Sequence, residues 1–319
     1  MPSAEQTDRF RRDLEKLAGG PPERLGLAVS GGPDSLALLL LAHAAFPGEV
    51  EAATVDHGLR AGNATEAAMV RGFCAPLGVP HETLADPDAP IDGASAQAQA
   101  RRLRYRLLAG WAERRGIALL ATAHHADDQA ETVLMRLARG AGLSGLSAIR
   151  PRRNEGPVAL LRPLLGWRRE ELAAIVAGAG LTAADDPSNR SDAYDRTRFR
   201  TLLAGCELLP APRLAAAAAH LGEAEDALEW AAEREWQARA RADRGAVLLD
   251  PHGLPAELLR RLSARAIETV RGERGDWRRD KLAAILAEIA PGGRATLAGI
   301  QVTGGAVWRF EREPPRRPV

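Results

Sequence analysis

Short apolar runs alternate with longer segments of helical periodicity through the first half of the chain. This alternation is typical of a parallel sheet covered by helices, because each helix carries the chain back to start the next parallel strand. We therefore predict a doubly wound α/β domain. Its predicted strands are Arg24–Ser30, Val50–Asp56, His81–Ala85 and Ala118–His124, and its predicted helices are Asp34–Ala45, Asn63–Leu77, Ala94–Arg115 and Asp127–Arg139.

The pattern changes in the second half of the chain. We predict an edge strand at Val158–Leu161, a helix at Arg168–Ala179 and then a polar loop, DDPSNRSD, of the kind that often belongs to a site. A proline-bounded, alanine-rich stretch from Pro212 to about Arg244 is predicted to be a helical connector to a second, smaller domain of mixed helices and strands. That domain is predicted to hold a strand at Ala246–Leu249, helices at Pro255–Arg271 and Asp276–Ile289, a hairpin of Ile300–Thr303 and Ala306–Phe310 closed by Gly304-Gly305, and a loose tail, EREPPRRPV.

Composition excludes several classes of protein. Hydrophobic residues make up 45% and charged residues 27% of the 319 positions, which is ordinary for a globular chain and not for a disordered or fibrous one. The net charge of +1 leaves room only for local basic patches. Cys74 and Cys206 form no CxxC pair, so neither a disulfide framework nor a cysteine-held metal is expected. With no signal peptide and no apolar run of ~20 residues, we expect a cytoplasmic protein.

A phosphate-binding loop is the first candidate site. The first predicted strand runs into Ser30-Gly31-Gly32-Pro33-Asp34-Ser35 and directly on into an apolar helix. Glycines let the backbone approach a phosphate, the start of a helix offers unpaired N–H groups, and the two serines add hydroxyl donors. No lysine is near, so this is not a Walker A loop. A carboxylate at Asp34 would repel phosphates unless a cation lay between them, which indicates a bridging Mg²⁺; the simpler alternative is that Asp34 only caps the helix.

The string SGGPDS resembles the PP-loop of the N-type ATP pyrophosphatases, which cleave ATP between its α and β phosphates. The resemblance implies ATP as substrate, Mg²⁺ as cofactor and a PP-loop fold. Several families share this loop, so it indicates the chemistry and not the second substrate.

Four further segments resemble the tRNA(Ile)-lysidine synthases, in the same order along residues 24–205. They are VDHGLR from Val55, ARRLRY from Ala100, ATAHHADDQAET from Ala121, and a run made of RPLL from Arg162, DDPSN from Asp185 and DRTRFR from Asp195. Two positions depart from the family pattern: Asp185 replaces a usual Glu, and Thr197 a usual Asn. The second departure leaves open which of Arg196, Arg198 and Arg200 reaches the triphosphate, and alignment with the motif favours Arg196.

The third segment is the most informative about substrate chemistry. Asp128 and Glu131 are three residues apart and share one face of the predicted helix, where two carboxylates could bind an ammonium group. Helix caps, structural histidines or a divalent metal site are the alternatives. By resemblance, Asp128 and Glu131 bind lysine. The resemblance also implies catalytic roles for Asp34, Arg101, His124 and Arg196, and an ATP site formed by Ser30, Gly31, Gly32, Pro33, Asp34, Ser35, Asp56 and His57.

The resemblance implies a ligase with three substrates. It would join free L-lysine to the wobble cytidine of the isoleucine tRNA with anticodon CAU, through an adenylated cytidine. We assign residues 1–207 to the catalytic PP-loop domain and residues 208–319 to a connector helix and a small tRNA-contacting domain. Residues 150–200 hold ten arginines against seven acids, which suits an RNA backbone. The oligomeric state is left open, with a homodimer as one option.

Three alternatives remain at this point. A PP-loop tRNA thiolase would use the same ATP chemistry but needs reactive cysteines. An amination like that of GMP synthetase needs a glutaminase domain that the chain does not have. A nucleotide-dependent RNA-binding protein without catalysis would bind tRNA and release no pyrophosphate.

Overall fold

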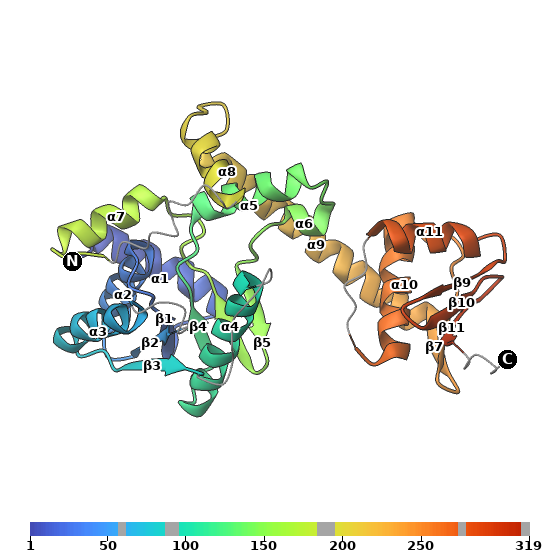
Figure 1. The fold of residues 1–319 in the computed structure, drawn as a ribbon, viewed down its shortest axis with the longest axis horizontal. Helices are drawn as coiled ribbons and strands as arrows, with labels where there is room; N and C mark the ends of the chain where they lie inside the picture. The colour runs from blue at the N-terminus through green and yellow to red at the C-terminus, as the bar shows by residue number, and fades with distance from the viewer. Residues whose placement is uncertain (57–61, 87–95, 184–194, 274–278, 314–319) are drawn as a thin grey trace. The chain divides into compact units, whose positions relative to one another are not determined.

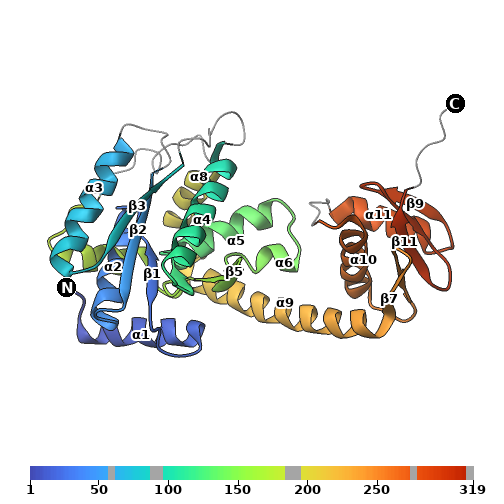
Figure 2. The same cartoon turned by 90° about the horizontal axis from the view of Figure 1, so that it is seen from below.

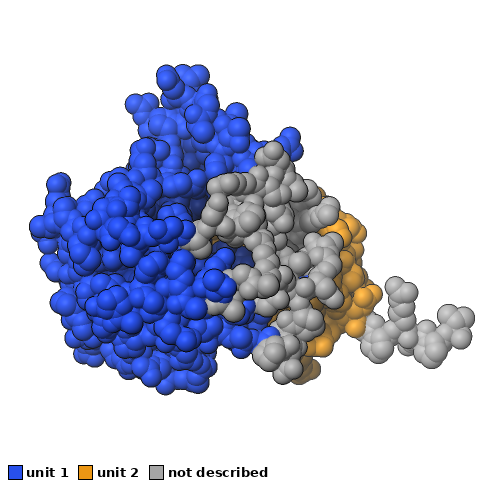
Figure 3. Space-filling view, turned by 60° about the vertical axis from the view of Figure 1, so that its left-hand side comes forward, with its two compact units in different colours: residues 1–222 blue, residues 223–319 orange. Residues whose placement is uncertain are grey.

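The computed structural model describes residues 1–56, 62–86, 96–183, 195–273 and 279–313. The chain divides into two compact units, residues 1–222 and 223–319, which Figure 3 colours separately. Each unit has a hydrophobic core of its own. The candidate site residues all belong to the first unit.

The first unit is built on a six-stranded sheet with the order β3-β2-β1-β4-β6-β5. All neighbouring strands are parallel except β5, which pairs antiparallel with β6. The strand order reverses direction between β1 and β4, and such a switch point opens a ligand crevice at the carboxyl ends of the strands. The strands are β1 (Leu25–Ala28), β2 (Val50–Asp56), β3 (His81–Ala85), β4 (Leu119–Ala121), β5 (Arg152–Glu155) and β6 (Val158–Leu161).

Helices cover both faces of this sheet (Figures 1 and 2). On one face, α2 packs against α1 and α7 in a core that includes Phe10, Leu39 and Trp167. On the other face, α4 contributes Leu108 and Trp111 to a second core cluster. The helices are α1 (Ala4–Ala18), α2 (Pro33–Ala45), α3 (Gly62–Cys74) with the 3₁₀ turn η1 (Ala75–Leu77), α4 (Ala96–Arg114), α5 (Ala126–Ala138), α6 (Leu143–Leu146), α7 (Arg169–Gly178) and α8 (Asp195–Ala204).

The second unit packs helices against an antiparallel sheet with the order β7-β8-β11-β10-β9. Its core contains Trp308 and Phe310 from the sheet and Leu262 and Ile267 from a helix. The long helix α9 crosses the division between the units. The elements are α9 (Ala211–Arg239), β7 (Ala240–Asp243), β8 (Ala246–Leu249), α10 (Ala256–Arg271), α11 (Arg279–Ile289), β9 (Arg294–Leu297), β10 (Ile300–Thr303) and β11 (Trp308–Arg312).

The doubly wound α/β prediction is confirmed, and the strands predicted at residues 50–56, 81–85, 158–161, 246–249 and 300–303 have the predicted bounds. One strand was misplaced in the sheet. We expected Val158–Leu161 at the edge, but it lies between β4 and β5, and all four of its residues are buried. The strand at this edge of the sheet is β5. Its sequence, RRNE, is polar and gives no hydrophobic pattern from which a strand could be predicted.

Three predictions in the C-terminal region were wrong in detail. The connector helix ends at Arg239 instead of continuing to Arg244, because residues 240–243 pair with β8. The hairpin is not closed by a two-residue turn, since Thr303 pairs with Arg309; Gly304 instead passes so close to α11 that a Cβ would lie 1.8 Å from the carbonyl oxygen of Ile289. The predicted loose tail begins inside β11, and residues 314–319 lie outside the described residues.

No helix in the described ranges combines the length and apolar character needed to cross a membrane.

Candidate active site

Two loops that are far apart in the sequence start side by side at the switch point of the sheet. Strands β1 and β4 are paired, with Leu27 opposite Ala121. The segment after β1 is the phosphate loop, residues 30–35, and the segment after β4 leads through Thr122 to α5. The fold therefore brings the two strongest sequence motifs into one crevice.

The phosphate loop is held by its own hydrogen bonds. Gly31 has φ +88°, a left-handed conformation that favours glycine. The Ser30 amide donates to Ser35 Oγ at 3.1 Å, and that hydroxyl donates to the carbonyl oxygen of Gly32 at 2.9 Å. Ser35 is buried and braces the loop, whereas Ser30 is exposed. Gly32 is the N-cap of α2 and has no side chain to cap it, so the first amides of α2 are available to an anion.

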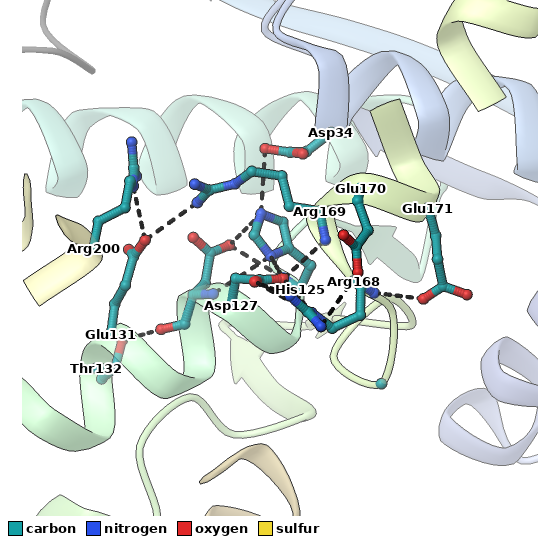
Figure 4. Close-up of polar contacts among 12 residues, drawn as sticks. Asp34, His125, Asp127, Glu131, Thr132, Arg168, Arg169, Glu170, Glu171 and Arg200 are labelled. Atoms are coloured by element: carbon teal, nitrogen blue, oxygen red, sulfur yellow. Dashed lines mark hydrogen bonds and ion pairs between the residues drawn. The ribbon is translucent and has the colours of Figure 1, made fainter. Parts of the chain in front are cut away.

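His125 connects the phosphate loop to α5 (Figure 4). Its fully buried ring lies with Nε2 3.4 Å from Asp34 Oδ2, and Nδ1 accepts a hydrogen bond from the Asp128 amide at 3.4 Å. Burial lowers the pKa of His125, but the hydrogen bond to Asp34 and the charges of Asp128 and Asp34 outweigh it, and the net direction is upward. His125 is therefore the contact between Asp34 and the acidic helix.

Asp34 has an oxygen that fits a cation. Its Oδ1 is buried and has no hydrogen-bond partner among the described residues, and the side chain as a whole is 32% exposed. Within the described residues no group of three or more His, Cys, Asp or Glu side chains forms a metal cage. Mg²⁺ commonly binds through one or two carboxylates together with substrate phosphates, which is the donor set that Asp34 and a bound nucleotide would supply.

The first turn of α5 uses its carboxylates to fix the local structure. Asp128 Oδ2 accepts a hydrogen bond from the His125 amide at 3.1 Å, which completes a capping box at the N-terminus of the helix. Asp127 accepts from the Arg169 amide at 2.8 Å and from the Arg168 guanidinium, so it ties α5 to the start of α7. Helix capping of α5, one of the alternatives weighed from the sequence, is thus present for Asp128 but not for Asp127, and it uses only one oxygen of Asp128.

The other oxygen of Asp128 belongs to a network of acids and arginines between α5 and α8. Arg196 donates to Asp128 Oδ1 at 2.6 Å and to Glu131 Oε2 at 2.6 Å. Glu131, only 1% exposed, also accepts from Arg200 at 2.9 Å and from Arg169 at 3.2 Å. Burial alone would raise the pKa of Glu131, but the hydrogen bonds from Arg200 and Arg196 lower it. We call these five residues the Glu131 network.

His124 has an environment unlike that of its neighbour. Its Nδ1 lies 3.0 Å from the Thr122 hydroxyl. Burial lowers the pKa of His124 well below its usual range, and nearby guanidinium groups lower it further, so the ring is neutral at neutral pH. Several cations around a neutral ring form a surrounding suited to an anion. The arginines concerned are Arg162, Arg101, Arg196 and Arg104.

Arg162 and Arg101 both place positive charge near His124, but Arg162 is buried and Arg101 is exposed. Arg162 is 3% exposed, and within the part of the chain that the structure describes its Nε is a buried donor without a partner. Arg101 is exposed on α4, with its guanidinium 5.1 Å from the centre of the Tyr105 ring. Arg153 lies over the same ring at 4.4 Å. Arg101, Tyr105 and Arg153 line part of a concavity of about 310 Å³, to which Arg162 does not contribute.

The structure brings most of the predicted site residues together. The phosphate loop is connected through Asp34 and His125 to Asp128, which shares Arg196 with Glu131, and His124 lies near Arg196. Asp56 ends β2, the neighbour of β1. His57 and Asp185 lie outside the described residues. Sequence reasoning weighed Arg200 only as a possible contact to the triphosphate, although its spacing from Arg196 puts the two on one helix face. It assigned no role in the site to His125, Asp127, Arg162, Arg168 or Arg169.

Comparison with known proteins agrees with this geometry. A family model described as a PP-loop domain matches residues 6–206. The tRNA(Ile)-lysidine synthase of Zymomonas mobilis is 48% identical over 314 residues, covering 97% of this chain and 94% of the relative. That of Novosphingobium aromaticivorans is 47% identical over 316 residues, with the same coverage. This chain belongs to the tRNA(Ile)-lysidine synthase family.

The likeness to the lysidine synthases extends beyond the PP-loop domain. Because the relatives cover 97% of the chain, the second unit is shared with them as well. Among solved structures, a U34-tRNA thiolase from Methanococcus maripaludis has a TM-score of 0.53 and 17% identity, over 67% of this chain and 76% of that one. That likeness shows a common fold. As a member of the PP-loop lysidine synthases, this enzyme uses ATP as a substrate.

Proposed function

We propose that this lysidine synthase joins free L-lysine to the wobble cytidine of the isoleucine tRNA with anticodon CAU, and that it cleaves ATP to AMP and pyrophosphate. The observation that carries the proposal is the His125 bridge, which connects the phosphate loop at Asp34 with the paired carboxylates of α5. A nucleotide site and an ammonium site are thereby parts of one crevice.

The first step activates the base. The O2 atom of the cytosine attacks the α-phosphate of ATP, an O–P bond forms, and the bond to the β-phosphate breaks to release pyrophosphate. The loop of Ser30, Gly31, Gly32, Pro33, Asp34 and Ser35 binds the phosphates, with Asp56 and His57 at its side. Arg101 and Arg196 stabilise the charge on the phosphates, an effect that is usually the largest in catalysis. His124 is neutral and acts by hydrogen bonding.

Asp34 is the residue that would hold Mg²⁺, through the buried oxygen that has no protein partner. The ion would neutralise charge between that carboxylate and the phosphates as the bond to pyrophosphate breaks. Asp34 is kept in place for this by the buried ring of His125.

The second step forms lysidine. The ε-amine of lysine attacks C2 of the adenylated cytosine, a C–N bond forms, and AMP leaves with the O2 atom. Asp128 and Glu131 bind the positively charged groups of lysine. Both carboxylates are paired with Arg196 in the structure, so lysine and Arg196 compete for them. When Arg196 turns to the phosphates of ATP, one oxygen of each carboxylate, Asp128 Oδ1 and Glu131 Oε2, becomes available to lysine.

The tRNA presents its target base in a single-stranded loop, where a base can leave its stack at low cost. We propose that the basic region of residues 150–200 contacts the loop and that residues 208–319 contact the rest of the tRNA. The enzyme would work in the cytoplasm, where tRNA is modified.

The test is pyrophosphate release by the purified protein with Mg²⁺ and ATP, combined with mass spectrometry of the tRNA nucleosides. We expect a lysine-dependent gain of mass on the wobble cytidine of the CAU isoleucine tRNA. Omission of tRNA should abolish pyrophosphate release. Release without lysine in the product would contradict the proposed ligation, and no release at all would favour the non-catalytic alternative.

The thiolase alternative is disfavoured by the two cysteines. Cys74 is 1% exposed, and burial raises the pKa of its thiol to about 11, so it is not a reactive thiolate. Cys206 is half-buried and forms no disulfide. The variant with Cys74→Ser and Cys206→Ser should retain full ligase activity, and loss of activity with retained folding would revive this alternative.

A further inference from the structure

A second concave surface lies next to the Glu131 network, between α5 and α8, which pack side by side (Figures 1 and 2). It encloses about 430 Å³. No step of the proposed reaction uses it. We call it the α5–α8 groove, and its lining residues are Met135, Ala138, Arg139, Arg198, Phe199 and Leu202.

The groove combines an apolar floor with basic side chains. Phe199 and Met135 are partly exposed and Leu202 is 52% exposed, so apolar side chains from both helices are accessible in the groove. Arg139 and Arg198 are exposed, and among the described residues the lining set contains no acid. An aromatic face beside arginines is the combination with which proteins hold an unstacked nucleobase and its phosphate.

The groove lies beside the Glu131 network along the same two helices. Met135 lies one helical turn beyond Glu131 on α5, a rise of about 6 Å. On α8, Arg198 and Phe199 lie between Arg196 and Arg200, which both bind Glu131. A single strand with one base in the active site therefore reaches the groove with a nearby nucleotide.

We infer that the α5–α8 groove binds one nucleobase of the anticodon loop next to the target cytidine. Phe199 stacks on the base and Arg198 contacts its phosphate. The inference rests on the proposed function and adds a subsite to it, because it assigns recognition of the loop to residues outside the reacting centre.

Size and charge favour RNA over a protein partner. A volume of about 430 Å³ is in the range of small-ligand pockets, whereas a specific protein interface buries more than about 1,000 Å². The exposed arginines complement phosphates and would repel a second copy of the same surface.

The experiment compares Phe199→Leu, Phe199→Trp and Arg198→Ala in steady-state lysidine formation with the full-length tRNA. We expect Phe199→Leu to raise the KM for tRNA about tenfold, since base–aromatic stacking is lost, with the KM values for ATP and lysine unchanged. Phe199→Trp should keep the KM near that of the wild type. Arg198→Ala should reduce the slope of log KM against log salt by about 0.7, the value for one phosphate contact with a single strand.

Controls distinguish failure of the groove inference from failure of the proposed function. Arg12→Ala, on the exposed side of α1, should leave the salt slope unchanged. Thermal unfolding and size-exclusion chromatography with light scattering of every variant check folding and oligomeric state. If the wild type forms no lysidine, the proposed function fails. If the wild type is active but folded Phe199→Leu and Arg198→Ala bind tRNA normally, or change only the oligomeric state, the groove inference is overturned.

Discussion

At the scale of single residues, Asp34 occupies a position where a carboxylate is costly unless a cation balances it. It lies in the first turn of α2, where incoming phosphates would be repelled by its charge, and one of its oxygens is buried without a partner. Pairing with His125 accounts for the other oxygen only. The unpaired oxygen is therefore the strongest physical argument for a metal at this point.

Asp34→Asn should lower the rate of pyrophosphate release roughly 100-fold or more, because the amide keeps the shape of the side chain but not its charge toward Mg²⁺. Residual activity should need a higher Mg²⁺ concentration for half-saturation. The melting temperature and the affinity for tRNA should change little. Normal pyrophosphate release by the folded variant would show that Asp34 has no role in holding a metal.

The variant Glu131→Gln tests whether the negative charge of Glu131 stabilises the fold, because that contribution depends on pH. The pKa of Glu131 is lower in the folded protein than its usual value of 4.5, so the carboxylate stabilises the fold above that value and the contribution is lost as the pH falls through the folded pKa. We expect the variant to be less stable by roughly 2 kcal/mol at neutral pH, below the 3–5 kcal/mol for a fully buried pair because the arginines are partly exposed.

The measurement is the melting temperature of both proteins from pH 7 down to pH 3. The difference should be largest near neutral pH and shrink below about pH 4.5. A difference that stays constant with pH would mean that shape, and not charge, is what Glu131 contributes.

The sequence pointed to the candidate site residues better than to their partners in the structure. Asp128, Glu131 and Arg196 stand in recognisable motifs, and each lies at the crevice. His125 could not be separated from His124, because both follow the same strand and only the fold makes one fully buried against Asp34 and the other neutral among arginines. Arg169 comes from a distant helix, so its contact with Glu131 depends on tertiary packing alone.

At the scale of elements, α5 and α8 are joined by the same carboxylates that are proposed to bind lysine. Arg196 bridges Asp128 and Glu131, and its proposed second position is on the phosphates of ATP. If one arginine serves both sites, binding of the nucleotide and binding of lysine must be coupled, and the coupling must be reciprocal.

Calorimetric titration of lysine can measure this coupling, with and without a non-hydrolysable ATP analogue. For the wild type we expect the analogue to tighten lysine binding by about tenfold, within the usual range of coupling energies. Arg196→Met should bind lysine more tightly than the wild type in the absence of nucleotide, because Asp128 no longer has a guanidinium partner. In this variant the ATP analogue should have little effect on the affinity for lysine. If Arg196→Met binds lysine more weakly than the wild type both with and without the analogue, Arg196 does not compete with lysine for the carboxylates.

Elements with a strong hydrophobic pattern were predictable, and those defined by pairing were not. The buried strand Val158–Leu161 was found with its bounds, but its place inside the sheet depends on β5, whose residues alternate between partial and full exposure. The short strands β7 and β9 are likewise polar or mixed in sequence and exist through their neighbours. Local pattern therefore predicted the elements of the parallel sheet and missed its antiparallel edge.

At the scale of the whole molecule, each of the two units has its own hydrophobic core. The candidate site belongs to residues 1–222, and the core of residues 223–319 contains none of its residues. Such cores can lose stability independently, because few contacts connect separate units. This independence allows the proposed tRNA-contacting role of the C-terminal region to be tested without touching the reacting residues.

Arg261 provides that test. On α10, 9% exposed, it forms ion pairs with Glu225 of α9 at 2.7 Å, with Glu257 at 3.0 Å and with Glu229, and the hydrogen bond to Glu225 raises its pKa. Arg261→Met leaves Glu225 buried without a partner, which should cost about 3 kcal/mol and lower the melting temperature of this unit by roughly 10–20 °C.

Between the melting temperatures of the variant and the wild type, Arg261→Met should have a KM for tRNA raised at least tenfold, with the KM for ATP unchanged, because only the second core is lost. Hydrogen exchange should show fast exchange in residues 246–312 and native protection in β1 and β4. The double variant with Arg261→Met and Glu225→Leu replaces the pair with apolar groups and should recover both stability and tRNA KM. A normal KM for tRNA while the second unit is unfolded would show that residues 223–319 do not contact the tRNA.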